Sequence, residues 1–368
     1  MEVHEIDTPV AVIDLDMMEQ NIESMARFTR EVGVDLRPHA KTHKVPEIAK
    51  LQIQAGARGI TVQKLGEAEV MADAGLSDIL ISYQIVGKVK LDRLVALQRK
   101  FQEQGKLMTA VDSVEVTEPL SRAMQVAGLI HDVVIEVDTG LGRCGVRSGG
   151  PTVALASKIA GLAGLNLRGI MTHEGHVYWG QTHEEIRATA LNAGRAMVET
   201  AELLREAGYA IDVVSVGSTP AALYTCTVAG ISETRPGNYI FNDLTQVRAG
   251  TCTTADCALT VHATVISRPN RDQAVIDAGS KAMSSDARPA NGSYGFVNDL
   301  PEATFVRASE EHGVLELNGN ARTLQVGDRV EIISNHACGT VNMYDELIGV
   351  RDGSVEVVWP VAARGRMR

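Results

Sequence analysis

The stretch VVIEVDTGLGRCG, residues 133–145, decides the fold of this chain. It opens with a run of β-branched apolar residues, which is typical of a strand that is buried on both faces. The run ends in Glu136 and Asp138 and passes into a glycine-rich loop that carries Arg143. A helical pattern follows over Thr152–Ala163. A buried strand, polar groups at its carboxyl end and a helix together form the unit of a parallel α/β fold.

The same strand–helix unit repeats on both sides of this stretch. Further strands are predicted at Val10–Asp14, Leu36–His39, Gly59–Val62, Ile79–Ser82, Met108–Val111, Leu167–Thr172, Val213–Val216 and near Glu233–Arg235. Helical patterns lie between most of them, which implies parallel strands joined by right-handed crossovers. About eight such units predict a (β/α)8 TIM-type barrel, with Val10–Asp14 as its first strand.

The pattern changes after about Thr245. Short alternating runs such as Leu259–Ser267 and Arg329–Ile333 are divided by Gly, Asn and Asp, which is typical of an all-β domain. The sequence therefore predicts an α/β barrel over residues 8–244, followed by a β-rich domain formed by residues 1–7 and 245–368.

Composition excludes several classes of function. Lys and Arg number 35 against 46 Asp and Glu, a net charge of −11, which argues against nucleic acid as the main partner. No long apolar run is present, so we expect no membrane span. The acidic start, residues 1–5, lacks the features of a signal peptide. The five cysteines are scattered and odd in number, which favours a reduced, cytoplasmic setting.

Active-site groups of a parallel barrel lie at the carboxyl ends of its strands. One predicted strand end carries RPHAKTHK, residues 37–44, where six side chains can carry positive charge or donate a proton. A lysine crowded by cations can have a lowered pKa and can form a Schiff base with a carbonyl or with pyridoxal 5'-phosphate (PLP). Lys41 is thus a candidate catalytic and cofactor-binding residue. The alternative is a solvated basic loop.

Two later strand ends carry candidate phosphate ligands. Gly217, Ser218 and Thr219 offer backbone N–H groups and two hydroxyls at the start of a helix. The tripeptide of Gly237, Asn238 and Tyr239 could supply further N–H groups. Each tripeptide alone could be an ordinary glycine turn. Their positions after the last barrel strands, where such folds often hold phosphate, favour the phosphate interpretation.

Two further motifs could bind ligands. Arg143 could hold an anion, or it could form an ion pair with Glu136 or Asp138. His336 and Cys338 are two residues apart, so on an extended segment their side chains share one face. Imidazole and thiolate suit Zn²⁺, and the positions left for water or substrate would make such a site catalytic. The alternative is a packed cysteine beside a surface histidine.

Together these motifs resemble the fold-type III PLP enzymes of the D-threonine aldolase and D-serine dehydratase group, which is related to the N-terminal domain of alanine racemase. The resemblance spans the whole chain in the right order. It rests on residues 8–10, 14–16, 37–44, 142–145, 277–279, 311–313, 336–338 and 359–365.

The resemblance implies a role for each candidate residue. Lys41 would hold PLP covalently, and His173 would face the ring of the cofactor. Gln63 and Arg143 would line the cofactor pocket, and His336 with Cys338 would bind a divalent metal. The phosphate would be bound by Gly217, Ser218, Thr219, Gly237, Asn238 and Tyr239. Such enzymes usually form homodimers in which the β-domain of one subunit completes the barrel mouth of the other.

The resemblance also implies a lyase that acts on a small 3-hydroxy-D-amino acid. Aldolases of the group typically carry His-x-Asp with Mn²⁺ or Mg²⁺, whereas the dehydratases carry His-x-Cys with Zn²⁺. Cys338 therefore favours Zn²⁺ and the elimination of water, which gives a 2-oxo acid and ammonia. Cleavage to glycine and an aldehyde is the main alternative. A racemase with Tyr344 as second base and a non-catalytic PLP-binding protein are further alternatives; the β-domain argues against the latter.

Overall fold

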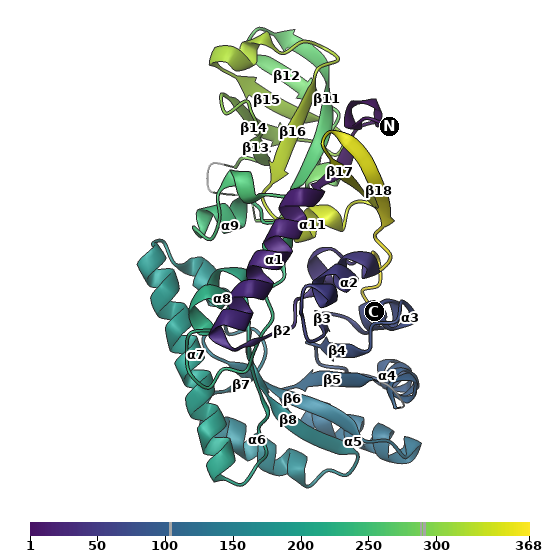
Figure 1. Ribbon diagram of the computed structural model, residues 1–368, viewed down its shortest axis with the longest axis vertical. Coiled ribbons are helices and arrows are strands. Elements are labelled where there is room, and N and C mark those ends of the chain that lie inside the picture. The colour runs from purple at the N-terminus through teal and green to yellow at the C-terminus, as the bar shows by residue number, and fades with distance from the viewer. Residues whose placement is uncertain (103–104, 288, 290–291) are drawn as a thin grey trace. The chain divides into compact units, whose positions relative to one another are not determined.

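The computed structural model describes residues 1–102, 105–287, 289 and 292–368, which fold into two compact units (Figure 1). The barrel unit comprises Ser24–Gly237 and Gly365–Arg368. The β unit comprises Met1–Glu23 and Asn238–Arg364. Helix α1 (Leu15–Val32) spans the first change of unit.

The barrel unit is built on parallel strands in the order β2-β10-β9-β8-β6-β5-β4-β3. A parallel bridge between His39 and Thr61 joins the two ends of this order and closes the barrel. The closed parallel arrangement confirms the predicted TIM-type barrel. Its strands are β2 (Asp35–Leu36), β3 (Ile60–Val62), β4 (Asp78–Ile81), β5 (Lys106–Val111), β6 (His131–Asp138), β8 (Leu165–Met171), β9 (Val213–Val216) and β10 (Glu233–Thr234), and β7 (Val146–Arg147) pairs with β6.

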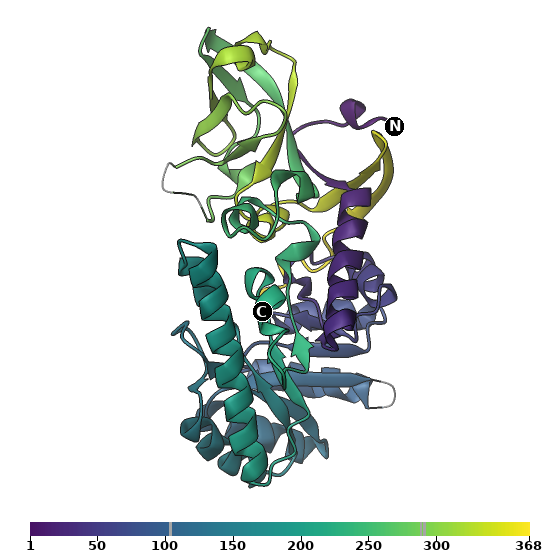
Figure 2. The ribbon, with the colours of Figure 1, turned by 60° about the vertical axis from the view of Figure 1, so that its left-hand side comes forward.

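Helices cover these strands and bury their apolar faces against them. They are α2 (Pro46–Gln54), α3 (Leu65–Asp73), α4 (Lys88–Phe101), α5 (Val114–Ala127), α6 (Gly150–Ala160), α7 (His183–Glu206) and α8 (Thr219–Thr225). Figure 2 shows α7 as the long teal helix beside the strands. A capping box starts α7, because Thr182 and Glu185 bond each other's backbone N–H groups.

The β unit confirms the predicted all-β domain. Strand β11 pairs with both β12 and β16, so β11, β12, β15, β14, β13 and β16 close a second, antiparallel barrel. Strands β1, β17 and β18 extend its sheet from β11. The strands are β1 (Val10–Asp14), β11 (Leu259–Asn270), β12 (Gln273–Ile276), β13 (Gly295–Val297), β14 (Ala303–Ala308), β15 (Gly313–Leu317), β16 (Arg329–Ser334), β17 (Glu346–Arg351) and β18 (Ser354–Pro360).

The place of Val10–Asp14 corrects the sequence-based prediction. These residues do form a strand, but it pairs with β11 and β17 of the β unit rather than opening the parallel barrel. Ala11 lies opposite Val261, and Val12 lies opposite Ile348. An apolar β-branched run predicts a buried strand, yet it carries no information about which sheet the strand joins.

None of the described helices combines the length and the apolar character that a membrane crossing requires.

Candidate active-site residues

Lys41 lies in a short 3-10 turn, η2 (Ala40–Thr42), directly after the residue that closes the barrel. The Nδ1 atom of His39 accepts a hydrogen bond from the backbone N–H of Lys41 at 3.3 Å. Ala40 and Thr42 are buried, whereas Lys41 is partly exposed. The predicted strand over Leu36–His39 is shorter than expected, because regular pairing of β2 ends at Leu36. A packed turn therefore presents Lys41 at the carboxyl end of this strand.

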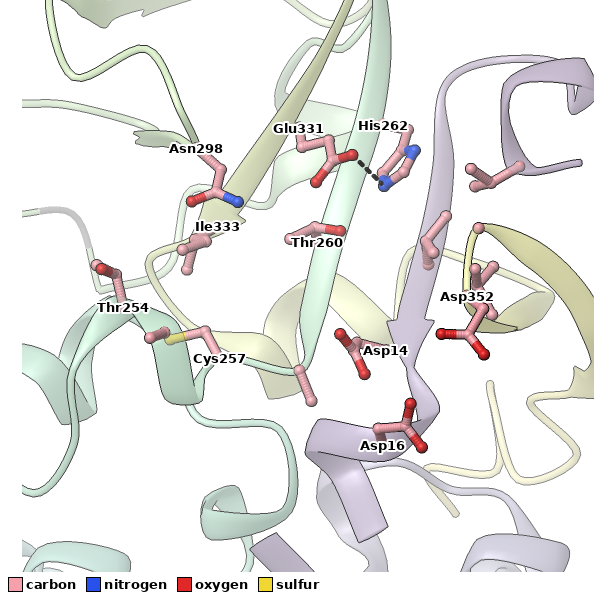
Figure 3. Close-up of a pocket in the computed structure, with 16 residues that line it drawn as sticks. Asp14, Asp16, Thr254, Cys257, Thr260, His262, Asn298, Glu331, Ile333 and Asp352 are labelled. Atoms are coloured by element: carbon pink, nitrogen blue, oxygen red, sulfur yellow. Dashed lines mark ion pairs between the residues drawn. The ribbon is translucent and has the colours of Figure 1, made fainter. Parts of the chain in front are cut away.

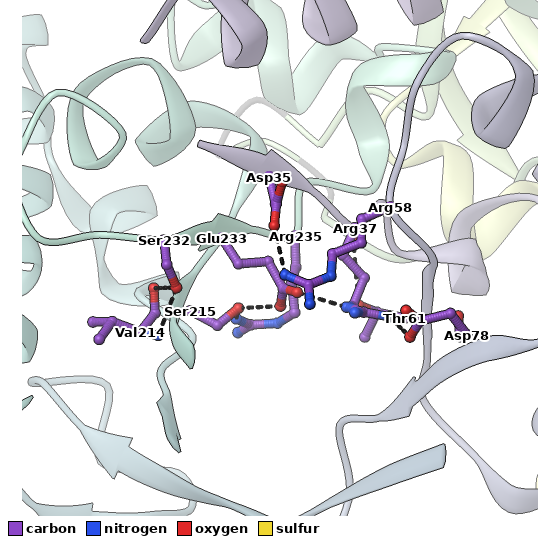
Figure 4. A network of polar contacts seen from close by, with 10 residues as sticks. All are labelled: Asp35, Arg37, Arg58, Thr61, Asp78, Val214, Ser215, Ser232, Glu233 and Arg235. Carbon is purple, nitrogen blue, oxygen red and sulfur yellow. Dashed lines mark hydrogen bonds and ion pairs between the residues drawn. The ribbon is translucent and has the colours of Figure 1, made fainter. Parts of the chain in front are cut away.

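The two cations that the sequence places on either side of Lys41, Arg37 and Lys44, are paired with carboxylates. Arg37 is buried and forms ion pairs with Asp78 at 2.5 Å and with Glu233 at 2.7 Å (Figure 4). The Nζ atom of Lys44 lies 3.5 Å from a carboxylate oxygen of Glu67. Two of the expected positive charges are thus neutralised by carboxylates that are distant in the sequence.

The histidines near Lys41 are uncharged. Burial, followed by the charges of Lys41 and Arg235, holds the pKa of His39 well below its usual range. Burial and the charges of Lys41 and Arg143 lower the pKa of His173 to about 3. The positive charges that act on these histidines are Lys41 itself and two arginines, Arg143 and Arg235, each of which follows another strand of the barrel.

Arg235 is a candidate site residue that the sequence analysis did not select. It follows β10 and is almost completely buried. Its guanidinium donates to the hydroxyl of Ser215 and, at 2.5 Å, to the carbonyl of Thr172. Burial lowers the pKa of Arg235, and Glu233 opposes that effect. Its position could have identified it, because Arg235, like Lys41, lies at the carboxyl end of a predicted strand. Pro236 and Gly237 come directly after it.

The two predicted phosphate turns approach these groups closely. Gly217 has φ of +146°, and a Cβ atom there would lie 2.3 Å from the backbone N of Arg235. A Cβ atom on Gly237 would lie 2.9 Å from the hydroxyl oxygen of Thr42, next to Lys41. Ser218 precedes α8, and its buried hydroxyl has no hydrogen-bond partner among the described residues. A buried hydroxyl without a partner, beside glycines and a buried arginine, fits the phosphate and the polar ring of PLP.

The Gly217 N–H group is already occupied. Both carboxylate oxygens of Glu174 lie 3.0 Å from the N atom of Gly217, and Glu174 is fully buried. Burial raises the pKa of Glu174. His173 contacts the carbonyl of Gly217 through Nδ1 at 3.2 Å. Glu174, which the sequence analysis did not select, therefore fixes the turn, and the hydroxyl of Ser218 is one donor that this turn leaves for a ligand.

Gln63 and Arg143 have different surroundings. The Oε1 atom of Gln63 lies 3.2 Å from Nε2 of His39, and its amide donates to the carbonyl of Ser82 at 3.1 Å. Gln63 thus contacts His39, whose other ring nitrogen accepts the backbone N–H of Lys41. Arg143 is half-exposed and lies 3.8 Å from Glu136, a long ion pair of the kind expected as its alternative role. Its charge nevertheless lowers the pKa of His173, after burial and Lys41.

The remaining cofactor candidates belong to the β unit. Asn238 and Tyr239 are buried in a 3-10 turn, η4 (Asn238–Ile240). The amide of Asn238 donates to the carboxylate of Asp243, while its Oδ1 atom has no partner among the residues that the structure describes.

The metal candidates lie at the start of α11 (Ala337–Val341). His336 is its N-cap and Cys338 its second residue, so the predicted extended segment ends at His336. The two side chains still interact: burial alone would lower the pKa of His336, but Cys338, Asp243 and Asp286 raise it to about 10. The Nδ1 atom of His336 lies 2.5 Å from Oδ2 of Asp286.

This arrangement fits a bound cation. The raised pKa of His336, caused first by Cys338, indicates that the pair favours added positive charge, and a carboxylate on Nδ1 leaves Nε2 for a metal. No cluster of three or more histidine, cysteine or acidic side chains suited to a metal occurs in the described part of the chain. The pair would therefore leave coordination positions for water or substrate.

A separate cavity of about 470 Å³ in the β unit contains none of the predicted site residues (Figure 3). It is lined by acidic groups that include Asp14, Asp16 and Glu331. Burial and then the charge of Asp299 raise the pKa of Glu331. Asp14 also accepts from the N–H of Met17 at 2.9 Å at the start of α1, so part of this lining is structural.

Comparison with known proteins gives matches over both units. The family model described as alanine racemase, N-terminal domain, matches residues 13–244, and the putative serine dehydratase domain matches residues 258–350. The D-threonine aldolase of Arthrobacter sp. is 36% identical over 99% of this chain and 94% of its own length. The D-threo-3-hydroxyaspartate dehydratase of Delftia sp. (strain HT23) is 37% identical over 95% of this chain and 96% of its own length.

Solved structures agree with these matches. A D-threo-3-hydroxyaspartate dehydratase with one cysteine replaced by alanine, in the metal-free form, has a TM-score of 0.91 to this chain. The two are 36% identical, and the match covers 98% of each chain.

Proposed function

We propose that this chain, which belongs to the family of fold-type III PLP-dependent lyases with an alanine racemase-like barrel and a serine dehydratase domain, eliminates water from a 3-hydroxy-D-amino acid. The products would be a 2-oxo acid and ammonia. The observation that carries the choice of reaction is the interaction of Cys338 with His336, because a thiolate favours Zn²⁺ over Mn²⁺ or Mg²⁺.

PLP, when bound, supplies an electron sink for negative charge that develops at the substrate Cα. We assign Lys41 Nζ to its covalent attachment and, once released, to the removal of the Cα proton. Ser218 would donate its unpaired hydroxyl to the phosphate, with Thr219, Gly237, Asn238 and Tyr239 completing that site. The turn at Gly217 is held in place by Glu174.

The residues around Lys41 set its electrostatic surroundings. His173, which would face the ring, is uncharged at neutral pH, so it contributes shape and a hydrogen bond rather than charge. Arg143 and Arg235 supply the positive charge that an anionic cofactor requires, and Gln63 holds His39 in place.

His336 and Cys338 would bind the divalent metal in the β unit. A Lewis acid at this pair would assist departure of the β-hydroxyl group as hydroxide. Asp286 would orient the imidazole through Nδ1.

Cleavage between Cα and Cβ is the second candidate reaction, and it yields glycine and an aldehyde. It is favoured by the similarity to D-threonine aldolase, which is as high as the similarity to the hydroxyaspartate dehydratase. It needs the same lysine, cofactor and metal, and it differs in removing the hydroxyl proton instead of the Cα proton.

Racemisation is disfavoured by the surroundings of Tyr344, the residue considered as its second base. The Tyr344 hydroxyl is buried without a hydrogen-bond partner among the described residues. Burial, followed by the charge of Asp277, raises the pKa of Tyr344, so its hydroxyl stays protonated at neutral pH and cannot accept the Cα proton.

A product assay distinguishes the two lyases. The purified protein, loaded with PLP and Zn²⁺, is incubated with D-serine, D-threonine and 3-hydroxy-D-aspartate. Formation of 2-oxo acid and ammonia in equal amounts supports dehydration. Formation of glycine and aldehyde instead would establish the aldolase, and absence of both product pairs would overturn the proposed function.

A chelation experiment tests the metal. Extensive dialysis against a chelator should abolish turnover, and Zn²⁺ should restore it better than Mn²⁺ or Mg²⁺. Turnover that survives verified metal removal would contradict the assignment of His336 and Cys338.

We also propose the remaining features that the resemblance implies. The lysine that holds the cofactor would belong to the barrel unit and the metal to the β unit. The protein would be a cytoplasmic homodimer, and its mass in solution, measured by light scattering, tests the dimer.

A further inference from the structure

A cation beside the metal pair has no role in the proposed reaction. Arg248 is the last residue of α9 (Leu244–Arg248) and is exposed. Its Nη1 atom donates to Oδ1 of Asn335 at 3.2 Å, and Nη2 donates at 3.1 Å both to the hydroxyl of Thr245 and to the carbonyl of Ala287. All three acceptors are uncharged. Asp243 acts on Arg248 through its charge, but within the described residues no carboxylate is in hydrogen-bond or ion-pair contact with the guanidinium.

Two sets of hydrogen bonds tie Arg248 and its helix to the segments that carry the metal pair. Asn335 directly precedes His336, and Ala287 directly follows Asp286, whose carboxylate contacts His336 at 2.5 Å. In addition, the carboxylate of Asp243 accepts from the N–H of Gln246 in α9 at 3.0 Å and from the N–H of Ala337 in α11 at 2.8 Å. The helices that carry Arg248 and Cys338 are thus bound to the same side chain.

The chemistry of the proposed substrate indicates which group could bind to Arg248. In the proposed reaction the β-hydroxyl group binds at the metal pair. The other substituent is bonded to the same Cβ atom, so it lies close to the metal pair as well. A guanidinium whose hydrogen-bond partners are uncharged can bind a carboxylate there through charge-assisted hydrogen bonds. The hydrogen of D-serine or the methyl group of D-threonine would gain no such interaction.

We propose that Arg248 forms a subsite for a β-carboxylate, so that the preferred substrates are dicarboxylic 3-hydroxy-D-amino acids of the 3-hydroxy-D-aspartate type. This inference rests on the proposed lyase function, whichever of the two bonds is broken. Arg248 acts here as a specificity residue and takes no part in proton transfer.

Steady-state kinetics of Arg248→Gln test the subsite. For 3-hydroxy-D-aspartate, kcat/KM should fall about 10- to 100-fold, the usual effect of losing a charged hydrogen bond. For D-serine and D-threonine, kcat/KM should stay within about threefold of the wild-type value. Arg248→Lys keeps the charge but loses the planar fork. Its kcat/KM for 3-hydroxy-D-aspartate should lie between the values of the wild type and of Arg248→Gln. The matched control is Arg322→Gln, which removes an exposed guanidinium of the β unit paired with Asp272.

A binding measurement gives a readout that does not depend on turnover. D-Aspartate and D-alanine lack the β-hydroxyl group and differ in the β-carboxylate. Calorimetric titration of the loaded wild-type protein should show D-aspartate binding about 10-fold more tightly than D-alanine. Arg248→Gln should abolish that difference, whereas Arg322→Gln should preserve it.

The outcomes separate the two proposals. If the wild-type protein turns over any of the three hydroxy-amino acids, but Arg248→Gln affects all of them equally or none, the subsite is overturned and the lyase function stands. If the wild-type protein turns over none of them, the lyase function is overturned and the subsite with it.

Discussion

At the scale of single residues, burial separates charged from uncharged groups along RPHAKTHK. The pKa of His43 falls to about 4 because of burial, as the pKa of His39 also falls, while Arg37 and Lys44 are neutralised by carboxylates. Lys41 is the partly exposed amine of this stretch. The environment thus presents Lys41 partly exposed, while Arg37 and Lys44 are held by carboxylates.

Replacement of Lys41 by alanine should remove the visible absorbance of the protein-bound cofactor. The reason is that no other amine is proposed to bond the cofactor carbonyl. Absorbance spectra of the PLP-loaded proteins check this, and turnover should be lost in parallel. Lys44→Gln, which breaks an ion pair in the same stretch, is the matched control and should keep the absorbance. A Lys41→Ala protein with the wild-type spectrum would exclude Lys41 as the attachment site.

His131 should make stability depend on pH. It is completely buried, with Gln98 at 2.7 Å and Thr109 at 3.1 Å, and burial lowers its pKa to about 3. Below pH 6.5 the unfolded chain binds a proton at His131 that the folded chain does not, so the free energy of unfolding falls as pH falls from 6.5 toward 3. At pH 5 this amounts to about 2 kcal/mol.

Urea unfolding of His131→Gln at pH 7 and pH 5 checks this prediction. The variant should lose less stability than the wild type between these pH values, by about 2 kcal/mol. The exposed His183, replaced by Gln, is the control and should retain the wild-type difference. Parallel losses in the wild type and in His131→Gln would contradict the assigned role of burial.

The positions of several candidate residues at strand ends were predictable from the sequence. Lys41, Gln63, His173 and the two glycine turns follow strands, and strand ends can be found from apolar runs. The charge state of the histidines was not predictable, because it depends on burial by segments distant in the sequence. Arg37 shows the same limit, since its partners Asp78 and Glu233 come from other strands.

At the scale of elements, one buried carboxylate organises the end of the β unit that carries the candidate metal ligands. Asp243 receives hydrogen bonds from the amide of Asn238 in η4, from the start of α9 and from Ala337 at the start of α11. It therefore joins a candidate phosphate turn to the helix that carries Cys338. Neither α9 nor α11 has a strong pattern in the sequence, because five residues are too few to show helical periodicity.

Asp243→Asn should weaken metal binding without changing the cofactor absorbance. Asparagine keeps the shape but replaces one accepting oxygen with a donor, so one backbone N–H group loses its partner. Loss of an outer-shell partner typically costs about 10- to 100-fold in metal affinity. Competition with a chromophoric zinc chelator measures this affinity. Asp272→Asn, at an exposed ion pair of the same unit, is the control, and equal zinc affinity in both variants would contradict the role of Asp243.

At the scale of the whole molecule, the chain changes unit three times, and residues 365–368 return to the barrel unit. The N–H group of Gly66 donates to the backbone oxygen of Arg368 at 3.0 Å, and Arg93 donates to the same oxygen at 3.0 Å. The late return of the chain to α3 has no signal in composition or periodicity. It could not be predicted from sequence for that reason.

Deletion of residues 365–368 should lower the free energy of unfolding by about 1–2 kcal/mol, because two hydrogen bonds are lost. Urea unfolding measures the change. Gly66→Ala gives a matched test, since its Cβ atom would lie 2.7 Å from the backbone oxygen of Arg368. The substitution should destabilise the full chain and be nearly neutral in the shortened one. An equal cost of Gly66→Ala in both backgrounds would exclude the contact as a source of stability.

The pairing of β1 has a consequence for the order of events during synthesis. Residues 10–14 leave the ribosome early, but their partners in β11 and β17 are made only after the whole parallel barrel has been translated. An apolar strand with two unpaired edges must therefore wait for its sheet while the chain grows. During this delay the exposed amino-terminal segment is a binding site for chaperones. Non-local pairing of this kind also slows folding.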